Sequence, residues 1–399
     1  MTPKSKFFSA GAAALITGFI LLASGCAPTK ETVMQRISAR SYPKFYDDMR
    51  FDALEYGISQ SLAYLNRLPA DRQFVFGGDS YTARHMIQSL EYFLQYVKTR
   101  PSADDLDKFI RSNYIVYRAV GRDSGGEMLY TGYYEPNLRG SLQPDAQYRF
   151  PIYARPSDLF TVDLSLFNEK YAGRIIGRLA GQTLVPYYDR SAIDAGGVLD
   201  GKADVLAWVD DPVDVFFLQI QGSGKVYLDS GEVLNIHYHT SNGRPYRSIG
   251  TLLIEDKQIS ADEMSMQKIR EYLNDHPDKM PGVLNYNPSY VFFKVEPDGP
   301  LGNINVRLTP GRSIALDYRI FPAAALAFIE TEKPLVDGAG RIESWRRFGR
   351  FVLNQDTGGA IRGPGRADLF FGNGPYAEIA AGHLKHIGKL YFLVLKPES

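Results

Sequence analysis

Cysteine is nearly absent from this chain: Cys26 is the only one among 399 residues. A single cysteine cannot form an internal disulfide, and the sequence has neither a cysteine pair nor an HExxH segment that would indicate a zinc site. Basic and acidic residues balance at 45 each, so the composition indicates no nucleic-acid partner. The roughly 370 residues after Cys26 are enough for two domains held by hydrophobic cores.

The N-terminus has the composition of an export signal. Lys4 and Lys6 precede an apolar run over residues 7–23, and small residues stand directly before Cys26. This pattern resembles the bacterial lipobox, with Ala23 where leucine is usual, and it predicts a lipoprotein signal peptide over residues 1–25. A short transmembrane anchor with a chance cysteine is the alternative.

Lipidation of Cys26 would attach the protein to a membrane without a spanning helix. Ala27 rather than Asp follows this cysteine, which in enteric-type sorting favours the outer membrane, with the protein facing the periplasm. Residues 29–43 are polar without clear periodicity, so residues 26–43 are predicted to form a lipidated tether.

The first part of the chain predicts helices followed by strands. Apolar residues recur at spacings of three and four over residues 54–65 and 86–97, which is typical of amphipathic helices. Ser102 is placed to cap a third helix. Residues 114–120 and 128–134 are rich in β-formers and flank a glycine-containing turn, so we expect a β-hairpin.

Short strands and turns dominate the remaining sequence. Residues 136–297 are predicted to form a second domain, whose clearest strand covers residues 213–221. Ser260 and Glu263 form a capping-box pattern ahead of one helix. The last third is predicted to be β-rich without a long helix. One strand is predicted at residues 290–295, near the end of the second domain. The strands predicted in the last third cover residues 306–308, 313–318, 324–330, 348–354 and 391–395.

Two aspartates stand in a glycine-rich stretch near the C-terminus. Asp356 and Asp368 lie among six glycines over residues 356–374. Glycine allows positive φ and close approach to a ligand, so this stretch predicts a loop shaped around a substrate. Burial and a neighbouring carboxylate can raise the pKa of an aspartate, and a carboxyl protonated near neutral pH is a general acid.

The pattern Asp-Thr/Ser-Gly, found at Asp123, Asp229 and Asp356, is also that of aspartic proteases. The protease loops continue to a serine or threonine, whereas here the next residues are Gly126, Glu232 and Gly359. The sequence therefore disfavours a protease.

Other candidate centres are weaker. His237 and His239 alternate along a predicted strand and would share a face, as in a two-histidine metal site, but no third ligand is evident. Ser223 lacks the G-x-S-x-G pattern of a nucleophile elbow. Tyr133 and Tyr134 at a strand end suit a platform for a sugar ring, with a core hairpin end as the alternative.

Five motifs, in this order, resemble the membrane-bound lytic murein transglycosylase A family, which carries a C-terminal 3D domain. They are Thr131-Gly132-Tyr133-Tyr134, Gln221-Gly222-Ser223-Gly224, Tyr246-Arg247-Ser248-Ile249-Gly250, the segment 287–293 and the loop 356–372. The resemblance covers residues 130–395. It implies a mainly β fold with N-terminal helices: a double-psi β-barrel domain over residues 44–135 and 298–399, and a smaller β-domain inserted over residues 136–297. A groove between the two domains would hold the glycan.

The resemblance also implies a reaction. Family members cut the β-1,4 bond between N-acetylmuramic acid and N-acetylglucosamine without water, because the muramic C6 hydroxyl closes a 1,6-anhydro ring. The catalytic aspartate of the family maps onto Asp368, which would act first as acid and then as base. Asp356 and Asp317 would orient or tune it. The implied partners are peptidoglycan glycan strands and the membrane, with no cofactor and no metal.

Substrate contacts implied by the same motifs come from the strand end and the two loops. They are Thr131, Gly132, Tyr133, Tyr134, Gln221, Gly222, Ser223 and Arg362, the last for a lactyl or peptide carboxylate. Asp356 could instead only brace its turn. Two other functions stay open: a glycan-binding envelope lipoprotein without activity, and a muramidase that uses water and a second carboxylate.

Overall fold

The computed structural model describes residues 33–123, 125–359 and 361–397. The predicted signal peptide and Cys26 lie outside these residues. Met34–Arg36 form β1, which pairs with β4 (Tyr114–Ala119), so the chain joins the fold earlier than a tether over residues 26–43 would suggest. In the described part of the chain, no helix is both long and apolar enough to cross a membrane.

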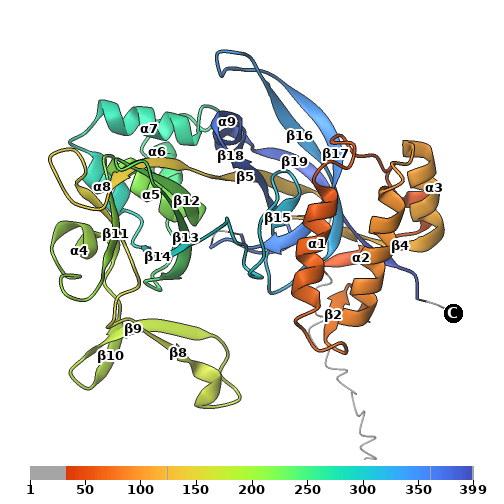
Figure 1. Cartoon of the computed structure of the whole chain (residues 1–399), viewed down its shortest axis with the longest axis horizontal. Helices are drawn as coiled ribbons and strands as arrows, with labels where there is room; N and C mark the ends of the chain where they lie inside the picture. Colours follow the sequence, from red (N-terminus) through yellow and green to blue (C-terminus); the bar gives the residue numbers. More distant parts are fainter. Residues whose placement is uncertain (1–32, 124, 360, 398–399) are drawn as a thin grey trace, which may run out of the picture. The chain divides into compact units, whose positions relative to one another are not determined.

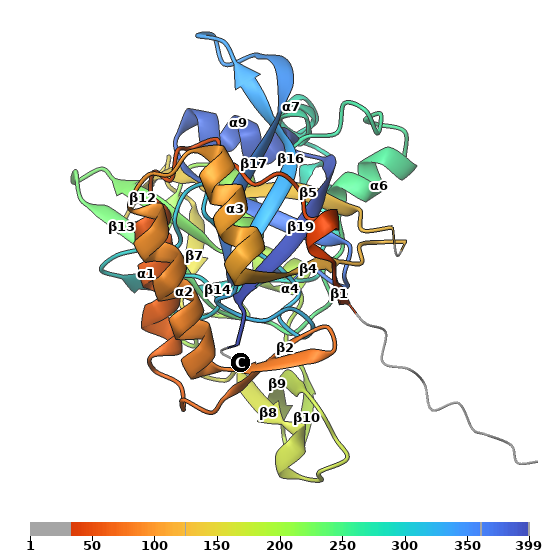
Figure 2. The same cartoon turned by 90° about the vertical axis from the view of Figure 1, so that its right-hand side faces the viewer.

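The three predicted N-terminal helices are confirmed as α1 (Leu54–Leu65), α2 (Ala83–Val97) and α3 (Ala103–Asn113). The predicted cap is also confirmed, because the Ser102 side chain accepts a hydrogen bond from the Asp105 backbone N–H at 3.2 Å. The apolar face of α1 packs on β17 (Ile342–Asp356), and that of α2 packs on β19 (His386–Leu395). The three helices lie together in front of the barrel in Figure 2.

Six strands form a closed barrel because β5 pairs with both β18 and β19, at the two ends of one strand order. The order is β5-β18-β15-β17-β16-β19, and β4 and β1 extend the sheet from β19. Beyond the barrel, β16 and β17 project as a long hairpin (Figure 1). The barrel strands are β5 (Met128–Glu135), β15 (Ser313–Ala315), β16 (Leu326–Val336), β17 (Ile342–Asp356), β18 (Arg366–Asn373) and β19 (His386–Leu395).

The hairpin predicted over residues 114–120 and 128–134 is wrong, although both strands exist. β4 and β5 each pair with β19 and not with one another. The strand pairing depends on residues 256 to 281 positions away in the sequence, so the local turn signal could not determine it.

A second sheet lies entirely between β5 and β15 in the sequence. Its order is β14-β13-β12-β6-β11-β7, and its strands are β6 (Asn137–Ser141), β7 (Phe150–Tyr153), β11 (Val205–Val209), β12 (Ser223–Leu228), β13 (Val233–Ser241) and β14 (Val291–Glu296). A three-stranded sheet of β8 (Phe160–Asp163), β9 (Arg174–Ala180) and β10 (Thr183–Pro186) belongs to the same stretch, while β2 (Gln73–Phe76) and β3 (Asp79–Thr82) pair near the N-terminus. This topology supports the proposed insert over residues 136–297.

The strand predicted over residues 213–221 is instead helix α5 (Pro212–Gln221). The Asp211 side chain caps it by accepting from the Val213 N–H at 2.8 Å, and Gly222, with φ of 83°, ends it. Phe216 belongs to one buried cluster and Leu218 to another. Because α5 lies between two cores, it is apolar around most of its surface. Its sequence is therefore a nearly continuous apolar run, which is also typical of a buried strand.

The remaining helices are short. Ser260 and Glu263 do bond one another, but they close a turn, and α7 (Met266–Asp275) begins later with Ser265 as its cap. Residues 306–308 form only an isolated bridge from Arg307 to Leu301 rather than a strand. The other helices are α4 (Arg190–Ala195), α6 (Ile249–Glu255), α8 (Met280–Asn285) and α9 (Pro375–His383).

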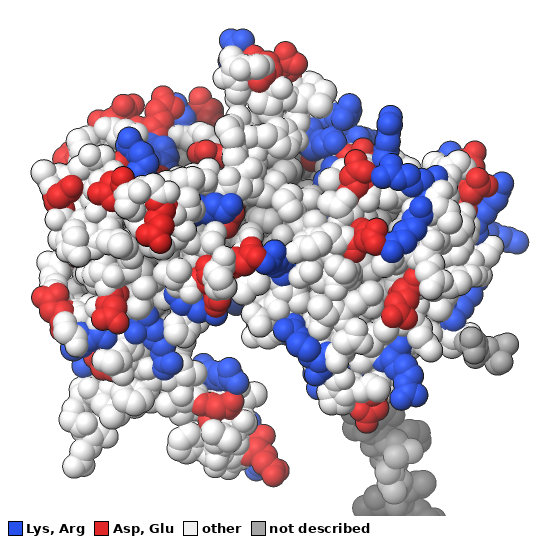
Figure 3. Space-filling model, viewed as in Figure 1, with Lys and Arg blue, Asp and Glu red and all other residues white. Residues whose placement is uncertain are grey.

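Basic and acidic side chains are mixed over much of the face in Figure 3.

Candidate active site

Strand register brings the two loop aspartates into one row on the barrel. Ala315 in β15 pairs with Asp356 in β17 on one side and with Asp368 in β18 on the other. Asp368 in turn pairs with Thr131 in β5. Since neighbouring strands lie about 4.8 Å apart, the two aspartate backbones are separated by about 10 Å.

Asp368 has one oxygen held by protein groups. The Thr131 hydroxyl donates a hydrogen bond to Oδ1, and the Arg366 Nε lies 3.3 Å from the same atom. Arg366 also donates to the Thr131 hydroxyl oxygen at 3.2 Å. Among the described residues, nothing donates to Oδ2, and the side chain is 15% exposed. The geometry therefore leaves one carboxyl oxygen able to exchange a proton with a ligand.

Arg366 and Tyr246 are residues that the sequence reasoning missed as site residues. Arg366 stands two positions before Asp368 and so shares its face of β18, a spacing that could have indicated it. Burial raises the pKa of Tyr246, while the nearby positive charge of Arg366 lowers it. Tyr246, from the inserted segment, is thus near enough to Arg366 for their charges to interact.

Asp356 has a raised pKa. Burial raises it to about 6, and the negative charge of Asp368 adds to the effect. Backbone N–H groups of Thr357 and Asn303 work in the opposite direction, and the Asn303 bond to Oδ1 is 2.9 Å long. Asp356 therefore changes charge close to neutral pH.

This raised pKa predicts a measurable effect on stability. The folded state keeps the Asp356 proton up to about pH 6, whereas an ordinary aspartate loses it near 3.8, so stability falls as pH rises through this window. Asp356→Asn should remove the fall, because the amide stays neutral and still accepts the backbone bonds. We expect the variant to be more stable than the parent by about 3 kcal/mol at pH 7, with the gain vanishing below about pH 4.

Urea unfolding at pH 4, 5, 6 and 7 measures this difference. Asp229→Asn, in the exposed turn after β12, is the matched control and should follow the parent curve at each pH. Parallel curves for Asp356→Asn and the parent would show that the carboxyl is not the source of the pH dependence.

Asp317 has the opposite character. Its carboxylate receives two bonds from Arg319, at 2.8 and 2.6 Å, and one from the Gly363 N–H at 2.9 Å, and these lower its pKa to about 2. It therefore stays ionised and anchors the loop between the two other aspartates. Arg362, in the same loop, is exposed and donates to the carbonyls of Gly358 and Ile361.

The predicted aromatic platform is divided between two faces of β5. Thr131 and Tyr133 share the face of Asp368, and the Tyr133 ring lies 5.1 Å from that of Phe370. The Tyr133 hydroxyl is buried and makes no regular hydrogen bond to the described residues, yet it lies near enough to Asp356 to lower that carboxyl's pKa. Burial and Asp356 raise the pKa of Tyr133 itself, so its hydroxyl stays neutral.

Gly132 and Tyr134 face the other way, toward α9. A Cβ on Gly132 would come within 2.7 Å of the Ala381 Cα, so this glycine is required by packing. Tyr134 is 5% exposed and packs against the same helix. Its backbone N–H donates to the Gln221 side chain at 3.0 Å, which ties the end of α5 to β5.

Gly222 and Ser223 complete this connection. Gly222 ends α5 in the left-handed region, and the buried Ser223 starts β12 opposite His237. His237 is buried, whereas His239 is exposed, because the ladder with β14 has a bulge between Tyr238 and Thr240. The two histidines thus do not share a face. The described residues contain no group of three potential metal ligands of the His, Cys, Asp or Glu type.

Two stretches match described protein families. Residues 129–294 match the MltA specific insert domain, and residues 312–394 match the 3D domain. The membrane-bound lytic murein transglycosylase A of Vibrio cholerae is 31% identical over 280 residues, which are 69% of this chain and 68% of that protein. The chain belongs to the membrane-bound lytic murein transglycosylase A family. The Escherichia coli K12 member is also 31% identical, over 70% of this chain and 69% of its own length.

Solved structures of this family share the fold. The membrane-bound lytic murein transglycosylase from Agrobacterium tumefaciens is 30% identical, with a TM-score of 0.72 over 91% of this chain and 97% of that one. MltA from Neisseria gonorrhoeae is 27% identical, with a TM-score of 0.67 over 91% and 93%. E. coli MltA with bound chitohexaose is 22% identical, with a TM-score of 0.68 over 91% and 95%. The predicted fold class, a double-psi β-barrel with an inserted smaller β-domain, is confirmed.

Proposed function

We propose that this protein is a peptidoglycan lytic transglycosylase that cuts the β-1,4 bond between N-acetylmuramic acid and N-acetylglucosamine and leaves a 1,6-anhydro end. Membership of the family makes it an enzyme of the lytic murein transglycosylase class. The chitohexaose bound to E. coli MltA supports a glycan strand as substrate. The observation that carries the mechanism is Asp368, largely buried, with Oδ1 held and Oδ2 free of protein donors among the described residues.

One carboxyl is sufficient for this reaction. Protonated Asp368 gives its proton to the leaving glycosidic oxygen, and its carboxylate then favours the positive charge that develops on the muramic ring. The nucleophile is the C6 hydroxyl of the substrate, whose proton returns to Asp368 as the anhydro ring closes. An ordinary glycosidase needs a second carboxylate because its nucleophile or activated water comes from outside the substrate.

The neighbouring residues have supporting roles in this proposal. Thr131 and Arg366 fix Oδ1, so that Oδ2 faces the glycan. Asp356, with its pKa of about 6, is protonated in part of the molecules near neutral pH and so limits the negative charge beside Asp368. Asp317 anchors the loop through Gly363. The hydrogen bond from the Tyr134 N–H on β5 to Gln221 of α5 brings the insert beside this strand, which supports a groove between the insert and the barrel as the glycan site.

The remaining predicted contacts keep their proposed roles at the ends of this groove. Five of them would contact the glycan directly: Tyr133, Gln221, Gly222, Ser223 and Arg362. Gly132 and Tyr134 would act from the opposite face of β5 by fixing the position of this β-strand. The family name supports attachment to a membrane. We further propose anchoring in the outer membrane through lipid on Cys26, with the enzyme facing the periplasm and using no cofactor.

Product mass separates this function from a water-using muramidase, which the row containing both Asp356 and Asp368 makes the second candidate. Digestion of purified murein sacculi should release disaccharide peptides that are lighter by one water than the products of a hydrolase. Lysozyme-type muramidase is the reference digest. Reducing muramic ends would assign the hydrolase, and intact sacculi would assign a glycan-binding lipoprotein.

A further inference from the structure

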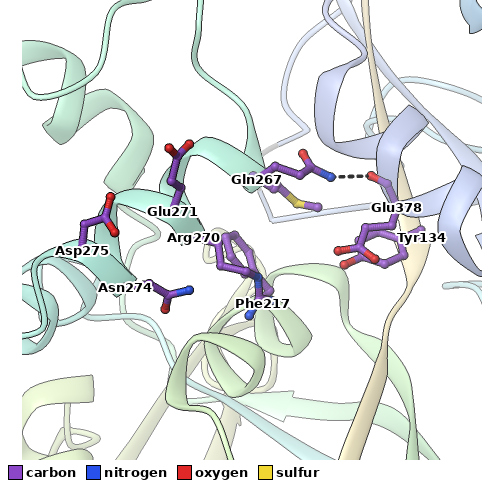
Figure 4. A pocket seen from close by; sticks show the side chains of 9 residues that line it. Tyr134, Phe217, Gln267, Arg270, Glu271, Asn274, Asp275 and Glu378 are labelled. Carbon is purple, nitrogen blue, oxygen red and sulfur yellow. Dashed lines mark hydrogen bonds between the residues drawn. The ribbon is translucent and has the colours of Figure 1, made fainter. Parts of the chain in front are cut away.

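A pocket of about 360 Å³ lies on the side of β5 opposite to the catalytic row. Because side chains alternate along a strand, Tyr134 points away from the face that carries Thr131 and Tyr133. The pocket walls come from α7, from Phe217 of α5, from Tyr134 and from Glu378 of α9 (Figure 4). The Gln267 amide of α7 donates to the Glu378 carbonyl oxygen at 3.1 Å, which joins the walls from the insert and the barrel.

The charge in this pocket is negative. Arg270, the only cation among its lining residues, is already neutralised by Asp211 at 2.9 Å and Asp214 at 2.5 Å. The half-buried Glu378 carboxylate has no ion pair with any described residue. Figure 4 shows it directed from α9 into the space between α9 and α5. Glu271 and Asp275 are exposed at the α7 side, where acidic side chains gather in Figure 3.

Tyr134 supplies a second, independent indication of a ligand. It is 5% exposed, and its hydroxyl makes no hydrogen bond to the described residues. Burial and the nearby Glu378 raise the pKa of Tyr134, so the hydroxyl is neutral and can accept from a cation. The Tyr134 side chain is buried but lines the pocket, and its hydroxyl and the unpaired Glu378 carboxylate present two neighbouring acceptors to a ligand that carries donors.

We propose that this pocket binds an aliphatic primary ammonium group. The Glu378 carboxylate and the Tyr134 hydroxyl, which lie side by side in Figure 4, offer acceptors for its donors. The ring of Phe217 and the side chain of Met266 provide an apolar wall for the carbon stem. The ammonium would come from a free diamine or from a lysine-like side chain of a peptide. The site does not depend on the proposed reaction.

Calorimetric titration of the full-length protein at pH 7 and low salt tests the site. The probes are cadaverine, N-acetyl-lysine amide, and diacetylated cadaverine as the neutral analogue. We expect both amines to bind and the neutral analogue not to bind. Glu378→Gln should weaken amine binding about tenfold, and Tyr134→Phe, which loses only a hydroxyl, a few-fold. Glu343→Gln, at an exposed glutamate on β17, is the matched control and should bind like the parent.

Tighter binding of the lysine amide than of cadaverine would identify a peptide as the source, and the reverse order would identify free diamines. Any of four results would overturn the proposal. The neutral analogue could bind as tightly as the amines, or neither amine could bind. Glu343→Gln could lose as much amine affinity as Glu378→Gln, or Glu378→Gln and Tyr134→Phe could both bind amines as tightly as the parent. Because the readout is binding, none of these outcomes depends on whether the protein cleaves glycan.

Discussion

Replacing Asp368 with Asn should abolish release of anhydro products, with a loss of about a thousandfold or more in the rate of murein digestion. The amide is nearly isosteric and can still accept hydrogen bonds from Thr131 and Arg366, so the local structure is retained. It can neither protonate the leaving oxygen nor remove the proton of the C6 hydroxyl. Quantifying anhydro muropeptides released over time measures the change.

Asp229→Asn is the control for this experiment, since it makes the same chemical change in an exposed turn far along the chain from the row. It should digest murein like the parent. An active Asp368→Asn enzyme would exclude Asp368 as the acid, and Asp356, the other carboxyl in the row, would then be the first candidate. A folded Asp368→Asn protein that still binds glycan would show that the loss lies in the chemical step.

Periodicity was sufficient for the N-terminal helices and insufficient for α5. Residues 86–97 have one apolar face because α2 covers only one side of the barrel, so the spacing of three and four is visible. Phe216 and Leu218 contact different cores from neighbouring positions of α5, so that helix carries no polar stripe. The features that distinguish it from a strand are its ends, Asp211 and Gly222, rather than its interior.

The candidate site could be predicted in its residues but not in its arrangement. Glycine content indicated the loop around Asp356 and Asp368, and the motifs indicated Thr131. Their common row depends on β15, a strand of three residues between β17 and β18, and on the register of Ala315 with both neighbours. No spacing within one segment contains that information. The same dependence on register separates Tyr133, beside the carboxyls, from Tyr134, in the pocket behind them.

Replacing Arg312 with Met should destabilise the protein by about 3–5 kcal/mol. Arg312 and Asp47 form an ion pair in which both side chains are 0% exposed, with bonds of 2.6 and 2.8 Å. The guanidinium also donates to the backbone carbonyls of Asp52 and Phe351. Methionine can fill the volume but leaves the Asp47 carboxylate buried with only backbone donors from the described residues. Urea unfolding at pH 7 measures the loss.

Two further variants isolate the cause of this loss. Arg341→Met breaks an ion pair with Asp337 in which the arginine is 80% exposed, so it should cost less than about 1 kcal/mol. The double variant Asp47→Leu, Arg312→Met should be more stable than Arg312→Met alone, because it removes the unpaired charge. A loss below about 1 kcal/mol in Arg312→Met would contradict the prediction, because it would show that Asp47 is accommodated without its partner. Arg312 directly precedes β15, and Asp47 lies in the segment before α1. Their ion pair therefore connects that segment to the strand that aligns Asp356 with Asp368.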